Sequence, residues 1–146
     1  LYEMLEHLTY NVDAMVDVRD SARQRAGKLG EKDALGKRLK DLADAVEKLR
    51  GSIVATKESA GITGEEKLRE KLGSLYGGVN GYDGRPTGSQ LERVGVLGKE
   101  LDTAIASFQG IVSKDLGPVN ILLEKRKLEA IKPLTEAEWR KRQEKT

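Results

Sequence analysis

The chain has 146 residues, no cysteine, 34% charged residues and a formal net charge of +2 at pH 7. This length predicts one domain with a hydrophobic core rather than two domains. The lack of cysteine excludes disulfides, thiolate catalysis and zinc sites with cysteine ligands, and no apolar run approaches the ~20 residues with which a helix spans a bilayer.

The composition favours helices over strands. Aromatic residues make up only 4% of the chain, so Leu, Val, Ile and Ala must fill the core. The basic excess is concentrated in residues 124–146, and the preceding part is close to neutral. Nucleic-acid binding usually needs a clustered basic face with stacking aromatics, so this distribution argues against nucleic acid as a partner.

The first two segments carry apolar residues at steps of three and four, the period of an amphipathic helix. In residues 1–29 these are Leu1, Leu5, Leu8, Val12, Met15, Val18, Ala22, Ala26 and Leu29. From residue 35 they are Leu35, Leu39, Leu42, Val46, Leu49 and Ile53. We therefore expect one helix over 1–29 and a second that begins at residue 35 and ends near residues 59–61.

A third helix is expected over residues 63–79. Thr63 and Glu66 have the spacing of a capping box, in which two side chains bond reciprocally to free backbone donors of the first turn. Its apolar stripe is Leu68, Leu72, Leu75 and Val79. The glycine-rich segment 77–88, which contains Pro86, ends this helix because each glycine costs about 1 kcal/mol relative to alanine.

A second capping box, Thr87 with Gln90, opens the last long helix. Its apolar stripe is Leu91, Val94, Leu97, Leu101, Ala104, Phe108, Ile111 and Leu116. Three glycines also lie in this helix: Gly95, Gly98 and Gly110. We expect a neighbouring helix to approach closely there. Pro118 lacks a backbone donor, so it either kinks this helix or restarts it.

The C-terminal part, residues 124–146, is a basic tail. A third capping box, Thr135 with Glu138, predicts a short helix that contains Trp139. We expect a solvated helix end, because basic side chains complement the negative end of the helix dipole. Contact with nucleic acid or another anionic surface is the less favoured alternative.

Short connections between amphipathic helices favour antiparallel neighbours. The sequence therefore predicts an all-α fold, an antiparallel up-down bundle of about four main helices plus a short C-terminal helix. Residues 1–146 are expected to form a single domain that belongs to a longer chain.

No set of residues matches an enzyme active site. His7 is the only histidine, and a metal site or a catalytic triad needs several converging groups. We therefore expect His7 to be a surface residue, and we predict no catalytic, cofactor-binding or metal-binding residues. The protein is accordingly predicted not to be an enzyme and to need no cofactor.

The segment 77–88 is the most unusual local sequence. It lacks the features of a phosphate-binding or calcium-binding loop, so a compact structural turn is the favoured interpretation. The alternative is a contact loop, since ordered loops often carry function. Its candidate residues are Asn80, Tyr82, Asp83 and Arg85. Tyr76 is expected to face the core, and Tyr82 to lie in the loop.

Residues across most of the chain resemble a known family. The stretches are Val16–Asp20, Arg69–Leu72, Leu75–Thr87, Gln90–Leu91, Leu97–Leu101 and Asp115–Asn120. Together they resemble the C-terminal helical region of bacterial sortilin-like proteins, which are secreted BNR-repeat proteins, often described as glycosyl hydrolase-like, with a β-propeller as their main body. The block Asn80–Thr87 is the specific part of this resemblance.

The resemblance implies a secreted or periplasmic setting and a helical domain beside a propeller. Any glycosidase residues would belong to the propeller, so none is assigned here. We expect a non-catalytic helical accessory domain whose partner is the rest of the parent protein or another protein. The alternative is a protein–protein interaction module that binds a separate partner through a helix face or through residues 77–88.

Overall fold

The structure, a computed structural model, describes residues 2–30, 32–53, 67–80 and 87–144. Its elements are α1 (Tyr2–Leu29), α2 (Ala34–Ile53), α3 (Leu68–Asn80), α4 (Gly88–Ile111), the π-helical turn η1 (Val112–Leu116), α5 (Gly117–Lys125) and α6 (Glu136–Glu144). Within these ranges every element is a helix and none is a strand. The predicted all-α fold is confirmed.

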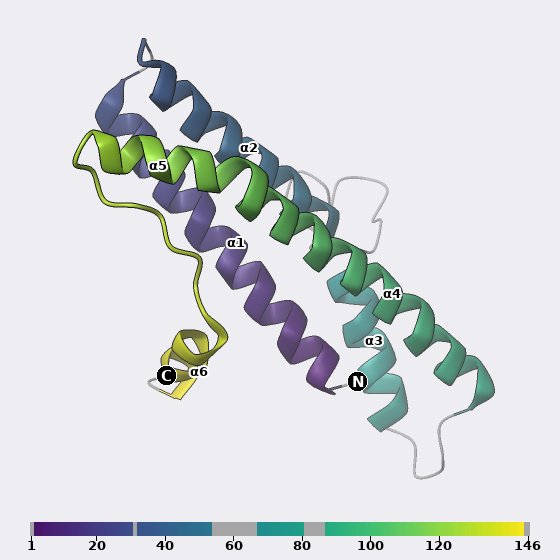
Figure 1. Cartoon of the computed structure of the whole chain (residues 1–146). Helices are drawn as coiled ribbons and strands as arrows, with labels where there is room; N and C mark the ends of the chain where they lie inside the picture. Colours follow the sequence, from purple (N-terminus) through teal and green to yellow (C-terminus); the bar gives the residue numbers. More distant parts are fainter. Residues whose placement is uncertain (1, 31, 54–66, 81–86, 145–146) are drawn as a thin grey trace.

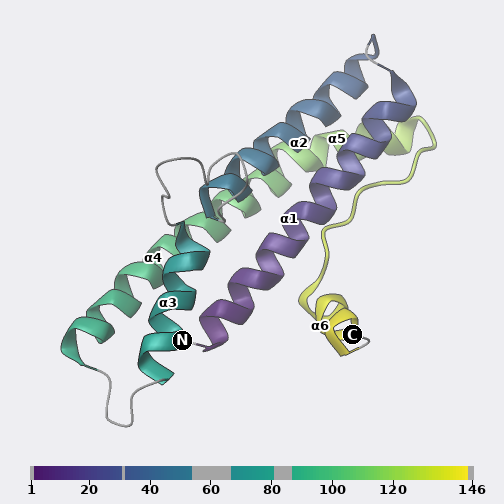
Figure 2. The ribbon, with the colours of Figure 1, turned by 180° about the vertical axis from the view of Figure 1, so that it is seen from behind.

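The helices form an elongated bundle of three columns (Figures 1 and 2). Helix α1 runs in one direction, and α2 returns antiparallel beside it. Helix α3 then continues in the direction of α2, and α4, η1 and α5 form one long column that runs back. The bundle is up-down and antiparallel as predicted, but α2 and α3 share a direction instead of alternating.

Most of the core comes from the predicted aliphatic stripes, and Ile131, Leu134 and Trp139 join it from outside those stripes. Its buried apolar members are Leu8, Val12, Ala14, Met15, Val18, Ala22, Leu35, Leu39, Leu42, Ala43, Val46, Ile53, Leu68, Leu72, Leu97, Leu101, Phe108, Leu116, Val119, Leu123, Ile131, Leu134 and Trp139. The stripes of α1 and α2 are confirmed for the described residues, and Leu1 lies outside them. The prediction that Leu91 belongs to the buried stripe of α4 is wrong, because its side chain is 60% exposed. Helix α4 begins beyond the start of α1, so its first turns lack that neighbour (Figure 1).

The predicted capping boxes have three different outcomes. The box of Thr63 and Glu66 lies outside the described residues, and the described part of α3 begins at Leu68. The box at α4 is confirmed, because the Thr87 hydroxyl accepts from the Gln90 N–H at 3.1 Å and the Gln90 side chain accepts from the Thr87 N–H at 2.9 Å.

The cap of α6 differs from a capping box in one bond. The Thr135 hydroxyl accepts from the Glu138 N–H at 3.2 Å, as expected. It also donates to the Glu138 carboxylate at 3.0 Å, so the carboxylate bonds to the hydroxyl rather than to a backbone N–H. One backbone donor is satisfied instead of two.

Pro118 is accommodated by the π-helical turn η1, which directly precedes α5. Here the N–H of Gly117 donates to the carbonyl of Val112, five residues earlier, and Pro118 lies in the first turn of α5. In a regular α-helix the eight-residue step from Phe108 to Leu116 would turn the second side chain about 80° away from the first. The wider turn brings both into the core.

The glycines of α4 do not mark a helix contact, contrary to the expectation. Among the described residues, and apart from its chain neighbours and the nearby backbone of α4, a methyl group built on Gly95 or on Gly110 would have no atom within 4 Å. At Gly98 it would lie 3.4 Å from the Met4 methyl group, an ordinary side-chain contact. These glycines therefore lower the helix propensity of α4 without allowing a backbone to approach.

Residues 126–144, here called the C-terminal strap, return along α1 (Figures 1 and 2). Ile131, Leu134 and Trp139 of the strap are buried in the core, and Trp139 is only 5% exposed. The expected solvated helix end therefore holds for residues 140–144, which are exposed, but not for Trp139. The apolar side chains of the strap gain more from burial than its charged residues lose, because most of the charged ones stay at the surface.

Polar bonds fix the extended part of the strap. The Asn120 side chain donates to the carbonyl of Ile131 and accepts from its N–H, both at 2.8 Å. The Tyr10 hydroxyl donates to the carbonyl of Leu134 at 2.7 Å. Burial and nearby carboxylates raise the pKa of Tyr10, so its hydroxyl stays a donor at neutral pH.

Helix α6 pairs its side chains with acidic residues of α1. The pairs are Trp139 Nε1 with Asp13 at 2.7 Å, Arg140 with Glu6 at 2.9 Å and Arg142 with Asp17 at 3.0 Å. The three acidic residues recur at helical spacing, so they lie along one side of α1. The basic charge of the tail is thus partly neutralised within the bundle.

The strap leaves α5 through a Schellman motif with lysine at the glycine position. Lys127 has φ 60°, its N–H donates to Glu124, and the N–H of Leu128 donates to Leu123. This left-handed position usually holds glycine, because a Cβ atom there costs roughly 1–2 kcal/mol. The hinge between α5 and the strap is therefore locally strained.

Replacement of Lys127 by glycine should raise the free energy of unfolding by about 0.5–1 kcal/mol. Glycine relieves the strain at positive φ, and its greater freedom in the unfolded chain offsets part of the gain. Urea unfolding followed by circular dichroism measures this. Lys127→Ala is the matched control, because it keeps the Cβ atom and should leave stability nearly unchanged. Equal effects of the two variants would contradict the strain.

Candidate functional site

An electrostatic cluster joins α1 to α2. Glu47 accepts from Arg19 at 2.6 Å and from Arg50 at 2.7 Å, and its side chain is 30% exposed. Hydrogen bonds from Arg50 and Arg19, with their charges, lower the pKa of Glu47 to about 2 against the opposing effect of burial. A carboxylate held ionised by two guanidinium groups is a poor proton shuttle at neutral pH, so its role is to join helices.

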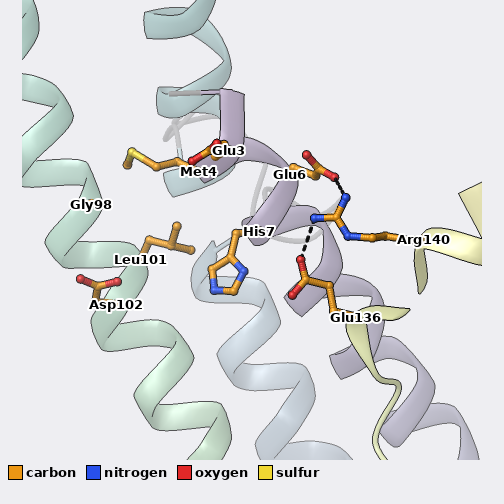
Figure 3. Close-up of a pocket in the computed structure, with 9 residues that line it drawn as sticks. All are labelled: Glu3, Met4, Glu6, His7, Gly98, Leu101, Asp102, Glu136 and Arg140. Atoms are coloured by element: carbon orange, nitrogen blue, oxygen red, sulfur yellow. Dashed lines mark hydrogen bonds and ion pairs between the residues drawn. The ribbon is translucent and has the colours of Figure 1, made fainter. Parts of the chain in front are cut away.

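A groove of about 700 Å³ lies between α1, α4 and α6 (Figure 3). Its lining residues are Glu3, Met4, Glu6, His7, Gly98, Leu101, Asp102, Glu136 and Arg140. His7 projects from α1 into the space beside Leu101 and Asp102 of α4 (Figure 3). Helical spacing places Glu3 and His7 on one face of α1 and Glu136 and Arg140 on one face of α6.

The charges of the groove are only partly balanced. Arg140 reaches across to Glu6 at 2.9 Å and also bonds to Glu136 at 2.9 Å. The hydrogen bond that Arg140 donates to Glu136 and the charge of Glu6 raise the pKa of Arg140, so it stays a cation. Glu3 and Asp102 add further negative charge at exposed positions. The groove therefore favours positively charged groups.

The geometry of the groove does not resemble an acid–base site. Its carboxylates are exposed or half-buried, whereas general acids and bases depend on burial to raise a carboxyl pKa. Over the described part of the chain, no three His, Asp or Glu side chains are grouped to hold a metal ion. The groove is therefore best suited to electrostatic contact with positively charged groups.

The predicted site residues are only partly placed by the structure. His7 is exposed, as predicted, with its ring centroid 6.3 Å from that of Tyr10. Asn80 is the last residue of α3, and Tyr82, Asp83 and Arg85 lie outside the described residues. In the sequence, the candidate contact residues therefore fall between α3 and α4.

Tyr76 meets its expectation in part. It lies on α3, one residue after Leu75, and its side chain is half-buried rather than a member of the core. The groove and the strap contacts were not anticipated from the sequence. Trp139, an aromatic residue within a strongly charged segment, was a signal of the strap contacts.

Comparison of the chain with protein-family models, with curated proteins and with solved structures found no match. The sortilin-like resemblance and the secreted or periplasmic setting therefore stay predictions. In the described parts of the chain, no helix combines the length and apolar character needed to cross a membrane.

Proposed function

We propose that this chain is a non-catalytic helical accessory domain of a larger secreted protein with a β-propeller body. The observation that carries the proposal is that the polar side chains join helices to one another. Glu47, whose pKa is the most strongly perturbed among the carboxyl groups of the described residues, joins two helices, and three side chains of α6 bond to α1. Such an arrangement stabilises a scaffold, because these polar groups bond to one another within the bundle.

The family resemblance supports the context of this proposal. Its specific block, Asn80–Thr87, follows α3 and precedes α4 in the sequence. Sequencing the complete gene tests this context, since propeller repeats with Asp-box motifs are expected beside the segment that encodes this chain. A different neighbouring domain would remove the context.

Tyr82 is the residue expected to contact the rest of the parent protein, because tyrosine combines an apolar ring with a polar end at interfaces. Tyr82→Ala should change the stability of the isolated domain by about 1 kcal/mol or less, as typical surface changes do. In the full-length protein it should speed proteolytic cleavage between the domains. Tyr82→Phe, which keeps the ring, is the control. Unfolding of the isolated domain by Tyr82→Ala would make the tyrosine a core residue.

The second candidate is a protein–protein interaction module that binds a separate partner. Two exposed apolar side chains near the start of α4, Leu91 at 60% and Val96 at 50%, favour it. A photo-crosslinking residue at position 91 of the full-length protein distinguishes the candidates. A product within one polypeptide supports the accessory domain, and a product with another polypeptide supports the module.

A further inference from the structure

The C-terminal strap is held to the bundle almost entirely by side-chain contacts. Arg25 of α1 donates to the carbonyl of Glu129 at 2.8 Å, and Asn120 of α5 bonds to both backbone groups of Ile131. The buried apolar residues of the strap then pack on the same helices. The strap is therefore a discrete segment that docks on α1 and α5.

The docking surface has a specific charge pattern. Glu6, Asp13 and Asp17 of α1 meet Arg140, Trp139 and Arg142 of α6, respectively. A segment that satisfies this surface needs an indole N–H between two guanidinium groups at the same spacing, preceded by apolar residues that fill the core. A second copy of this chain has the same sequence and therefore carries such a segment.

The hinge of the strap favours its release. Lys127 occupies the left-handed region at φ 60° only because the strap turns back there. If the strap leaves its own bundle, Lys127 can adopt right-handed helical geometry and extend α5, which relieves the strain. Hinge strain of this kind promotes exchange of an element between copies.

We propose that two copies of this chain exchange their C-terminal straps and form a closed dimer, in which each strap docks on α1 and α5 of the other copy. The contacts that residues 129–144 make with α1 and α5 are kept, while the turn at Lys127 opens, and the exchange is reciprocal, so the assembly closes at two copies. This proposal is independent of the propeller context.

The concentration at which straps exchange depends on the covalent link, or tether, between each strap and its own bundle. A segment joined to its own docking surface has an effective concentration on the order of millimolar. Exchange therefore needs chain concentrations near that value, unless relief at Lys127 lowers the requirement. Exchange should also be slow, because Trp139 must leave the core before a strap can dock on the other copy.

The test uses single cysteines, since the chain has none of its own. The variants Asp17→Cys and Arg142→Cys are prepared separately, mixed at about 1 mM chain, a concentration comparable with that of the tether, and joined with a short bis-maleimide after incubation. Positions 17 and 142 meet in the structure. A crosslink between the two variants can therefore form at this contact only if a strap has changed copies.

A second mixture, Asp17→Cys with Lys114→Cys, measures random encounters, because Lys114 is exposed in η1 and lies outside the strap. The expected result is several-fold more heterodimer from the first mixture, with a dimer mass by light scattering. Adding Lys127→Gly to both partners should reduce that excess several-fold, because the hinge strain is gone. Equal crosslinking in the two mixtures, or an excess unaffected by Lys127→Gly, would overturn the proposal.

Discussion

Replacement of Trp139 by alanine is expected to lower the free energy of unfolding by roughly 3–5 kcal/mol, the usual cost of removing a buried tryptophan. Its side chain is the one buried residue of α6, a helix that the structure describes completely. The ring also packs against Tyr10, with centroids 5.9 Å apart. Urea unfolding measured by circular dichroism gives the value, because the variant lacks the only tryptophan.

Trp139→Phe separates packing from hydrogen bonding. Phenylalanine keeps an aromatic ring beside Tyr10 but cannot donate to Asp13, so we expect a loss of about 1–2 kcal/mol. If alanine and phenylalanine cost the same, the hydrogen bond and not the packing holds α6. A loss below ~1 kcal/mol for alanine would mean that the strap is not docked in solution.

Acid is expected to weaken the junction of α1 and α2 through Glu47. The pKa of this carboxyl is about 2 in the folded chain and 4.5 in its reference state. A lowered pKa stabilises the fold above pH 4.5 by about 3 kcal/mol, which partial exposure of the pair reduces to about 2 kcal/mol. This contribution is lost as the pH falls from about 5 to 2, because the unfolded chain then binds the proton first.

Glu47→Gln tests this by removing the charge while keeping the shape. It should lower stability by about 2 kcal/mol at pH 7 and reduce the decline between pH 5 and 2, measured by urea unfolding at each pH. Glu100→Gln, at an exposed position of α4, is the matched control for the loss of one negative charge. A variant with the same acid decline as the wild type would show that other carboxylates dominate.

The parts of the fold that the sequence predicted are those with local causes. Apolar spacing determines which face of α1 or α2 is buried, and Thr87 and Gln90 are close enough along the chain to form their cap in isolation. Leu91 continues the same spacing, yet it is exposed because the neighbouring helix α1 begins further along the bundle. Periodicity identifies a face, and it does not reveal where a neighbour starts.

The strap and the groove depend on contacts between distant parts of the chain. Tyr10 bonds to the carbonyl of Leu134, and Arg140 bonds to Glu6, pairs that no local pattern connects. The polar composition of the C-terminal segment indicated solvent exposure, whereas three apolar residues decided its position. The contact loop was predicted from its own composition, and that composition carries no information about a partner.

The π-helical turn before Pro118 affects how this protein should be aligned with others. The turn holds one residue more than an α-helical path between Phe108 and Leu116 requires. A homologue with a single deletion within Val112–Leu116 would keep both apolar side chains in register with the core. A one-residue gap at this position would therefore mark conservation of the long helix, whereas the same gap in the middle of α1 or α2 would rotate half of a buried stripe towards water.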